Sequence, residues 1–264
     1  MCGRFAVTTD PALLAEKIKA LDEATGSADD GDKGKDGQSS GNYNVAPTTT
    51  ISVVVKRHSE PDDQSTRRVR LMRWGLVPPW SKTGEDGAPD SKAPLLINAR
   101  SEKVTESPAF RNSAKSKRCL IPMDGWYEWR PNGETAKGKK APKTPFYMYG
   151  EDGELLFMAG LWTTWRPKGA PKDTRPLVSC TIITTDAAGP LADIHDRMPL
   201  TVSAPDWDRW LDPDAPIDEG LLRGHGDLDR IAIREVSTLV NSVRNNGPEL
   251  IEPAEPQPEQ GTLL

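Results

Sequence analysis

Residues 118–129 read RCLIPMDGWYEW, and this stretch decides which class of fold to expect. It joins an apolar run of strand length to an aromatic one. Similar short runs recur at 51–55 (ISVVV), 68–74 (RVRLMRW), 145–150 (PFYMYG), 155–162 (LLFMAGLW), 177–185 (LVSCTIITT) and 230–236 (RIAIREV). Gly/Pro loops separate these runs, and strands do not alternate with long helices. The sequence therefore predicts an α+β protein with a single domain on a curved, mostly antiparallel, barrel-like β-sheet.

Short helices are expected around this sheet. Residues 8–21, TTDPALLAEKIKAL, read as a helix, because Asp10 can cap it, Pro11 suits its first turn, and apolar side chains recur at helical spacing. Shorter helices are expected at 99–106, 186–194 and 205–211. The polar stretches near 82–93, 130–144 and 166–176 read as hairpin loops or insertions.

Charge is distributed unevenly along the 264 residues. Residues 22–41 hold six acids and two lysines, and residues 252–264 hold three acids and no base. Both stretches are poor in apolar residues and are expected to be disordered, as an insertion and a tail of one domain over 2–251. The remaining body is weakly basic, with cationic clusters at 67–73, 111–118 and 137–143. This pattern fits a polyanionic ligand.

No apolar run approaches the ~20 residues of a membrane span, so we expect a soluble cytoplasmic protein that contacts no membrane. The three cysteines form no CxxC pair and no metal-ligand spacing, and no metal or other cofactor is expected. Cys119 and Cys180 lie in strand-like runs and read as buried small hydrophobes. Cys2 directly follows Met1. If Met1 is removed, Cys2 carries an α-amine and a thiol on adjacent carbons.

Several ordered motifs combine polar and aromatic residues. Behind MCGRF come YNVAPT (43–48), RWGLVPPW (73–80), NARSEKV (98–104), DGWYEW (124–129), AGLW (159–162) and IHDRMP (194–199). In this order they resemble the SRAP family, the SOS-response-associated peptidases, from Cys2 to about residue 251. The acidic insertion at 22–41 and the lengthened loops depart from the family pattern. These departures leave the motifs of the site intact and put loop-borne DNA contacts in doubt.

The resemblance implies a protein that shields abasic sites in the DNA damage response. In the family, the trimmed N-terminal cysteine forms a covalent thiazolidine with the ring-opened sugar of an abasic site in single-stranded DNA. The chemistry is reasonable for Cys2, because an α-amine titrates near ~7.7–8.0 and a cysteine thiol near ~8.5. The amine would form an imine with the aldehyde, and the thiol would close a five-membered ring. The resemblance also raises lyase activity and self-removal of Met1.

Glu128 is the candidate for proton transfer. It sits among aromatic residues, where a carboxylate is costly to bury unless it is paired or used. Strand alternation would place Trp126 and Glu128 on one face, with Tyr127 and Trp129 on the other. A raised pKa would let Glu128 protonate the sugar ring oxygen and then accept a proton from the amine.

Two further residues of the chemistry follow from the resemblance. His195, in IHDRMP, matches the family's active-site histidine, a second acid–base group. Asn98, in NARS, matches an asparagine that cannot transfer protons but can hold the sugar hydroxyl or the amine.

The resemblance also implies the DNA contacts. Arg4, Arg100 and Arg111 are expected to contact phosphates. Trp74 and Trp129 are expected to line the groove beside the lesion, although ordinary core packing is an equal alternative for both.

Two positions remain from the same comparison of motifs. Pro47 is expected where a duplex meets the pocket, and Thr184 is expected near the site. The implied partner is single-stranded DNA with an abasic site, including junctions of single strand and duplex. The protein is expected to act as a monomer in the cytoplasm, associated with the nucleoid when it binds DNA.

Three other functions share parts of these features. Class II glutamine amidotransferases also begin with Met-Cys-Gly and use the processed cysteine to cleave amides, but here that likeness ends after three residues. A non-catalytic reader of modified DNA bases would bind without Cys2. Proteolysis in trans is suggested by the family name alone.

Overall fold

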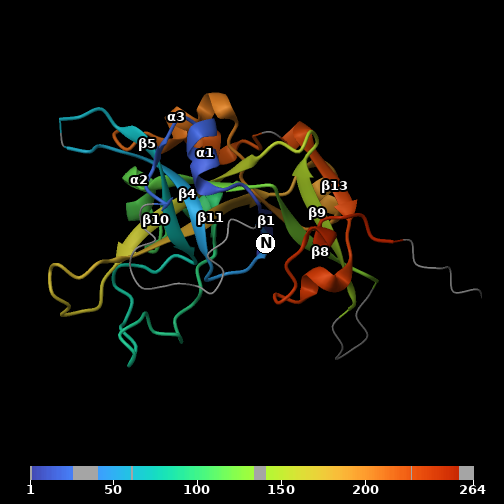
Figure 1. Ribbon diagram of the computed structural model, residues 1–264, viewed down its shortest axis with the longest axis horizontal. Coiled ribbons are helices and arrows are strands. Elements are labelled where there is room, and N and C mark those ends of the chain that lie inside the picture. Colours follow the sequence, from blue (N-terminus) through green and yellow to red (C-terminus); the bar gives the residue numbers. More distant parts are fainter. Residues whose placement is uncertain (1, 26–40, 61, 134–140, 227, 256–264) are drawn as a thin grey trace, which may run out of the picture.

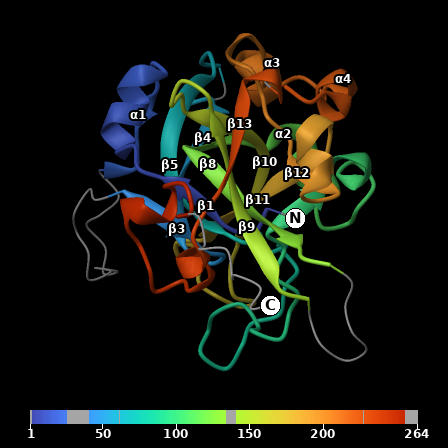
Figure 2. The same cartoon turned by 90° about the vertical axis from the view of Figure 1, so that its right-hand side faces the viewer.

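The computed structural model describes residues 2–25, 41–60, 62–133, 141–226 and 228–255 as two packed β-sheets (Figure 1). The larger sheet contains β2 (Leu21–Asp22), β4 (Thr50–Arg57), β5 (Thr66–Trp74), β6 (Asn98–Arg100), β7 (Arg118–Met123), β10 (Leu156–Trp165), β11 (Leu177–Asp186) and β12 (Arg197–Pro199). The smaller sheet contains β1 (Phe5–Val7), β3 (Asn42–Val45), β8 (Gly125–Pro131), β9 (Lys143–Gly150) and β13 (Ile231–Glu235), and it faces the viewer in Figure 2. The seven predicted runs all form strands.

The larger sheet closes on itself. Strand β11 pairs with β10 on one side and with β5 on the other, where Cys180 lies opposite Trp74. The order β11-β10-β7-β4-β5 therefore returns to β11 and forms a five-stranded barrel. Most pairs are antiparallel, and the pairs of β11 with β5 and β6 and of β2 with β5 are parallel. The predicted α+β fold on a curved, barrel-like sheet is confirmed.

Alternating side chains divide the core into three clusters. The interior cluster fills the barrel and the space between the two sheets, and it includes Cys119 and Cys180, both fully buried as expected. A second cluster covers the outer face of the barrel under the helices. A third cluster covers the outer face of the smaller sheet, where Tyr127 and Tyr147 pack with the C-terminal segments.

Four short α-helices flank the sheets: α1 (Pro11–Lys17), α2 (Arg111–Ser116), α3 (Trp207–Leu211) and α4 (Glu219–Arg223). The carboxylate of Asp10 accepts hydrogen bonds from the N–H groups of Ala12 (2.8 Å) and Leu13 (3.4 Å), so the predicted cap is confirmed. The helix ends earlier than predicted, because Lys19 has a positive φ of 53° and Leu21 already belongs to β2.

Short 3₁₀ helices are also present among the described residues: η2 (Ser101–Lys103), η3 (Gly189–Asp193), η4 (Ala204–Asp206), η5 (Leu228–Arg230), η6 (Thr238–Asn241) and η7 (Pro248–Leu250). The helical turns expected at 99–106, 186–194 and 205–211 correspond to η2, η3 and the pair of η4 and α3. No helix within the described residues is both long and apolar enough to cross a membrane.

The two acidic stretches begin within ordered structure. Asp22 lies in β2, and Glu23 forms ion pairs with Arg68 and Arg70. In the tail, the N–H of Ala254 donates to the carbonyl of Glu235 at 3.0 Å. The prediction of disorder is therefore too broad for 22–25 and 252–255, while 26–40 and 256–264 lie outside the described residues.

Candidate active site

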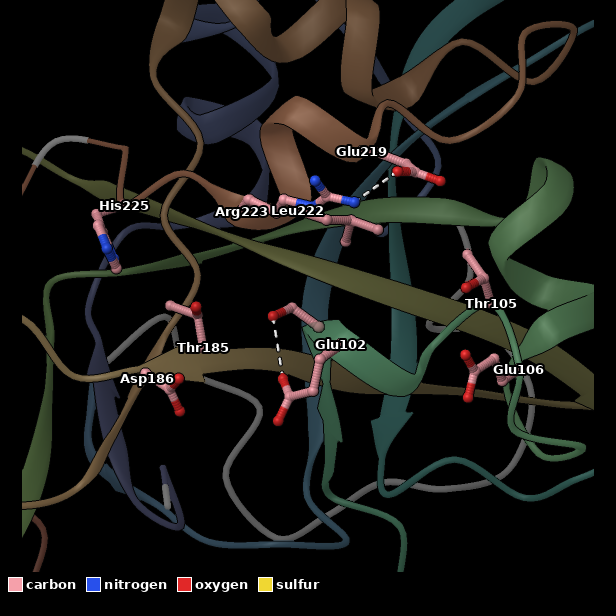
Figure 3. Close-up of a pocket in the computed structure, with 10 residues that line it drawn as sticks. Glu102, Thr105, Glu106, Thr185, Asp186, Glu219, Leu222, Arg223 and His225 are labelled. Carbon is pink, nitrogen blue, oxygen red and sulfur yellow. Dashed lines mark hydrogen bonds and ion pairs between the residues drawn. The ribbon is translucent and has the colours of Figure 1, made fainter.

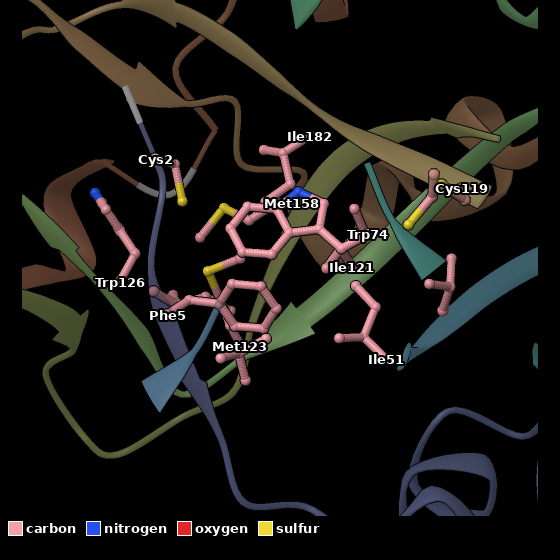
Figure 4. Close-up of a cluster of buried hydrophobic side chains, with 14 of the residues drawn as sticks. Cys2, Phe5, Ile51, Trp74, Cys119, Ile121, Met123, Trp126, Met158 and Ile182 are labelled. Carbon is pink, nitrogen blue, oxygen red and sulfur yellow. The ribbon is translucent and has the colours of Figure 1, made fainter. Parts of the chain in front are cut away.

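The site begins with the segment that leads into β1. This strand pairs with β8, with Phe5 opposite Trp126, and the N–H of Tyr127 donates to the carbonyl of Arg4 at 2.9 Å. The pairing carries Cys2, three residues before Phe5, into the interior cluster, where it is fully buried; Trp126 belongs to the same cluster (Figure 4).

Asn98 fixes the backbone of Cys2. Its side-chain Nδ2 donates a hydrogen bond of 2.8 Å to the Cys2 carbonyl. Asn98 begins β6, which pairs with β11 so that Asn98 lies opposite Ile182, another residue of the interior cluster. The two residues are 96 positions apart in the chain. The structure thus brings together the two residues that the motifs predicted to share a site.

Glu128 supplies a buried carboxyl group on β8. Its exposed fraction is 3%, and burial raises its pKa to about 7. That value already includes the charge of Asp196, which raises the pKa, and the charge of Lys143, which lowers it. Trp126 belongs to the interior cluster and Tyr127 to the outer one, so the predicted alternation along this strand is confirmed. A carboxyl group with a pKa near 7 can both give and take a proton at neutral pH.

The thiol of Cys2 differs from the sequence-based expectation. Burial raises its pKa far above the usual range, and the charge of Glu128 raises it further. The thiol is therefore protonated at neutral pH, and the expected thiolate fraction is absent in this arrangement. The charge of Glu128 thus acts on the Cys2 thiol across the interior of the protein.

His195 lies just after η3, and its Nδ1 faces two groups. The backbone N–H of Arg197 donates to Nδ1 at 3.0 Å, and a carboxylate oxygen of Asp196 lies 2.7 Å from the same nitrogen. Neutral His195 accepts from Arg197, whereas charged His195 donates to Asp196. Burial lowers its pKa although the charge of Asp196 opposes this, so the neutral form prevails at pH 7. The charges of Asp196 and Lys143 act on both His195 and Glu128, which places the two groups in one electrostatic environment.

Three buried polar atoms on β6, β8 and β11 have no hydrogen-bond partner among the described residues: Asn98 Oδ1, Trp126 Nε1 and Thr184 Oγ1. They come from three strands, and Thr184 follows Ile182 at the next inward position of β11. Buried polar groups without partners are rare and mark places where a ligand can bind. The expected position of Thr184 near Cys2 stays a prediction.

Arg197 is a residue of this region that the sequence analysis missed. Its guanidinium is buried and binds both carboxylate oxygens of Glu102 (2.9 and 3.0 Å), and it also pairs with Asp186. A further bond of 2.7 Å reaches the carbonyl of Thr184. Arg197 therefore joins the His195 segment to β11 and η2. The sequence signal that could have identified Arg197 is its presence within the motif IHDRMP.

An acid-lined cavity of about 550 Å³ includes in its walls Glu102 and Asp186, the two carboxylates that pair with Arg197 (Figure 3). Its walls include Glu102, Glu106, Asp186 and Glu219. Carboxylates repel phosphate, so a DNA strand is not expected to follow this side of the site. Within the described ranges, no three His, Cys, Asp or Glu side chains gather closely enough to hold a metal ion.

Two of the expected DNA contacts lie on the smaller sheet. Arg4 Nη1 donates to Asn44 Oδ1 (2.7 Å) and to the carbonyl of Val240 (2.9 Å). The guanidinium of Arg4 also lies 6.0 Å from the ring centre of Trp129, and Trp129 Nε1 donates to Asn241 Oδ1 at 2.7 Å. Both side chains keep part of their surface exposed. Their roles at phosphates and in the groove stay predictions.

Trp74 is placed differently from the expectation that it lines a groove. It is fully buried, its ring centre lies 5.0 Å from that of Phe5, and its Nε1 donates to the carbonyl of Ile97 at 3.0 Å. A tryptophan with no exposed surface cannot stack on a base. Trp74 instead packs against Phe5 in the interior cluster (Figure 4).

The remaining predicted contacts lie at three separate places. Arg100 is exposed and shares a face of β6 with Asn98, two residues away. Arg111 is exposed at the start of α2, which covers the outer face of the barrel. Pro47 is half-buried in the turn before β4, beside Thr48, which has a positive φ of 78°. Contact with DNA stays a prediction for all three.

The fold and the site define a class: a barrel protein with a buried cysteine at position 2 whose thiol is influenced by the charge of a buried carboxyl group. Residues 1–243 match the family of SOS response associated peptidases (SRAP). The chain therefore belongs to the SRAP family.

Relatives of known name cover nearly the whole chain. The abasic site processing protein YoqW of Bacillus subtilis is 36% identical over 258 residues, which cover 96% of this chain and 99% of that protein. The abasic site processing protein HMCES of Gallus gallus is 33% identical over 97% of this chain and 78% of its own. A crystal structure of a Bacteroides thetaiotaomicron protein matches with a TM-score of 0.73 at 23% identity, over 96% of this chain and all of the other, and shows the same fold.

Proposed function

We propose that this protein processes abasic sites by forming a covalent bond between Cys2 and the ring-opened sugar of single-stranded DNA. The observation that carries the proposal is the position of Cys2, held by Asn98 and coupled to Glu128, whose pKa is about 7. Relatives that match almost the whole chain are named abasic site processing proteins. The covalent bond would shield the lesion while the DNA is repaired or replicated.

Removal of Met1 is the first requirement. In the full chain the nitrogen of Cys2 is an amide, whose lone pair is delocalised and does not attack an aldehyde. Cleavage of the bond between Met1 and Cys2 by water gives a free amine. Self-cleavage is consistent with the family name, and a separate aminopeptidase would give the same product. The intact mass of Glu128→Gln, beside that of the wild type, distinguishes these routes, because self-cleavage assisted by Glu128 would leave Met1 in place in the variant.

Imine formation is the first bond-forming step. Protonation of the sugar ring oxygen by Glu128 opens the abasic deoxyribose to its aldehyde form. The amine of Cys2 adds to the aldehyde carbon C1′, and loss of water from the adduct gives the imine. Glu128 can supply the proton that the departing oxygen needs and accept the proton that the amine loses, because its pKa lies near the working pH.

Ring closure follows. The sulfur of Cys2 adds to the imine carbon, its proton moves to the imine nitrogen, and a five-membered thiazolidine forms. One amine, one thiol and one aldehyde thus give the ring and one water, with no change in oxidation state. Because burial keeps the Cys2 thiol protonated, a base must take its proton during the attack, and we assign that role to Glu128, whose charge acts on the thiol.

His195 and Asn98 have different roles. Neutral His195 keeps Nδ1 occupied by the Arg197 N–H, so its Nε2–H can donate a hydrogen bond to an oxygen of the sugar. Only the charged form, whose Nδ1 donates to Asp196, can give a proton. Asn98 Oδ1, buried without a partner among the described residues, can accept a hydrogen bond from the amine or a sugar hydroxyl. Asn98 would orient the reactants, and His195 would serve the reversal of the bond and any lyase step.

The proposal is tested by mixing the purified protein with single-stranded DNA that contains one abasic site. Intact mass spectrometry should show an adduct that survives denaturation and that intact DNA does not give. Cys2→Ala should abolish the adduct, whereas the matched control Cys180→Ala, at another fully buried thiol, should retain it. Normal adduct yield with Cys2→Ala would refute the assignment, and unchanged non-covalent binding in that variant would favour the reader of modified bases.

Two further parts of the proposal concern the setting. We place the protein in the cytoplasm, associated with the nucleoid when it is bound, and as a monomer on strands that include junctions with duplex DNA. Sedimentation with and without such DNA would test the monomer.

A further inference from the structure

The barrel end farthest from Cys2 is lined by cations. On β4, the inward positions Ile51, Val53 and Val55 belong to the interior cluster. The next inward position on this strand is Arg57, which is exposed. The strand therefore runs from an apolar interior to a charged rim.

Two neighbouring strands repeat this pattern. On β5 the inward positions continue from Met72 to Arg70 and Arg68. On the other side of β4, the inward position before Cys119 of β7 is Lys117. In Figure 4, Cys119 lies at the side of the cluster away from Cys2. We call Arg57, Arg68, Arg70 and Lys117 the cation ring.

Two members of the cation ring lie over the indole ring of Trp162. The guanidinium of Arg57 lies 5.6 Å and the ammonium of Lys117 5.4 Å from the ring centre of Trp162. Trp162 is buried at the last interior level of β10. Trp162 therefore holds the two cations in place by cation–π attraction.

The charges of the cation ring are poorly balanced. Burial lowers the pKa of Arg70, and the positive charges of Arg57 and Arg68 lower it further. The Glu23 carboxylate pairs with Arg68 and with Arg70. Among the described residues, the printed ion pairs set one negative charge against the four positive ones, which favours a positive potential at the mouth of the barrel.

A small cavity opens beside this mouth. It has a volume of about 110 Å³ and lies between Arg70, Arg175 and Val178. A water molecule occupies about 30 Å³ in the liquid, so the cavity has room for a few waters or for one phosphate group that replaces them. Guanidinium groups match the oxygens of a phosphate with two parallel hydrogen bonds.

We propose that the cation ring binds phosphate groups of a nucleic-acid strand, as a second contact remote from Cys2. The ring extends over three neighbouring strands about 4.8 Å apart, so it is wider than a single phosphate. A strand with regularly spaced phosphates fits this width better than one small anion. The proposal rests on the proposed function in one respect, that the bound polymer is the DNA that reacts at Cys2.

The geometry sets the length of DNA that reaches both places. Trp74, at the Cys2 end of β5, and Arg68, at the ring, are six residues apart, which corresponds to about 20 Å of strand. At about 3.4 Å for each nucleotide of a stacked strand, at least about six nucleotides separate the two contacts. A strand of about 10 nucleotides centred on Cys2 ends near the ring, and one of about 30 passes it.

The test compares binding of undamaged single strands of about 10 and 30 nucleotides by fluorescence anisotropy at several salt concentrations. The variant is Arg57→Gln/Lys117→Gln. The matched control is Lys103→Gln/Arg223→Gln, which removes the same charge from two exposed side chains in surface ion pairs. We expect the ring variant to bind the 30-nucleotide strand about tenfold more weakly and to lose about 1.4 from the salt slope, at ~0.7 for each phosphate. Loss on the short strand should stay below about twofold, and the control should match the wild type.

Two controls separate an effect of lost charge from an effect of misfolding. Arg57→Lys keeps the charge and should keep the salt slope, and thermal melts of every variant report whether it is folded. Equal binding of the long strand by the ring variant and the wild type would overturn the proposal. So would a loss of binding to inorganic phosphate or to an acidic peptide without a loss on DNA. Because the strands carry no abasic site, failure of the Cys2 chemistry would leave this result unaffected.

Discussion

The side chain of Asn98 donates a hydrogen bond of 2.8 Å to the backbone carbonyl of Cys2. This contact ties the residue that would react to the rim of the barrel, because β6 is paired with β11. The side-chain oxygen of Asn98, Oδ1, is buried without a partner among the described residues. Asn98 thus holds the nucleophile with one end of its amide and offers the other end to a ligand.

Replacing Asn98 with Asp should slow crosslinking by about tenfold or more. A carboxylate cannot donate to the Cys2 carbonyl, and a buried acceptor left without a partner costs about 1–3 kcal/mol. Single-turnover kinetics of adduct formation measure the effect. Affinity for undamaged strands should change less than twofold, and a loss of affinity equal to the loss of rate would assign Asn98 to DNA binding instead.

Glu128→Gln should separate activity from stability. We expect adduct formation to slow by about 10²–10⁴, the usual contribution of a positioned acid–base group. The amide keeps the size of the side chain and carries no charge. Rates measured between pH 5 and pH 9 should show an inflection near pH 7 in the wild type and none in the variant.

The raised pKa of Glu128 also predicts a change of stability with pH. The carboxyl group loses its proton near pH 4.5 when the chain is unfolded and near pH 7 when it is folded. The folded state therefore binds more protons between these values, and its stability falls as the pH rises through this window, by on the order of 3 kcal/mol. Glu128→Gln should remove that fall and melt above the wild type at pH 8. A variant that melts lower at pH 8 would show that the charged carboxylate is stabilised by its surroundings.

Arg197→Gln should lower both stability and rate. The guanidinium binds Glu102 with two hydrogen bonds and reaches the Thr184 carbonyl, and an amide cannot replace this set. We expect a loss of about 1–3 kcal/mol in the free energy of unfolding. As a positioning residue for His195, Arg197 should also alter the pH profile of crosslink reversal. A loss of stability with an unchanged profile would limit its role to structure.

The sequence predicted the elements whose pattern is local. The apolar runs gave all seven expected strands, and Asp10 with Pro11 gave the start of α1. The short strands β1, β3, β6 and β12 were not predicted, because they hold three or four residues each and depend on their partners. Closure of the barrel by β5 and β11 joins positions about a hundred residues apart, and no local pattern reports it.

The site shows the same limit. The motifs pointed to Cys2, Asn98 and Glu128, and the structure joins them by a hydrogen bond and a charge interaction. The protonated state of the Cys2 thiol was not predicted, because it depends on burial by residues remote in sequence. For Trp74 the motif left two alternatives, the groove and ordinary core packing, and its neighbours place it in the core.

Arg100 and Arg111 carry the last prediction, because the structure separates two residues that the motifs treated alike. Arg100 shares a face of β6 with Asn98, whereas Arg111 begins α2 on the outer face of the barrel. If the sugar reacts at Cys2, we expect Arg100 to contact a phosphate next to it, because Arg100 is exposed two residues from Asn98. Arg100→Glu should therefore weaken binding of a strand of about 10 nucleotides and lower the salt slope by about 0.7, the value for one phosphate. Arg111→Glu, with the same change of charge, serves as the matched control and should keep the slope on this short strand. Equal losses in both variants would show that DNA reaches the outer face, and a larger loss for Arg111 would place the strand along α2.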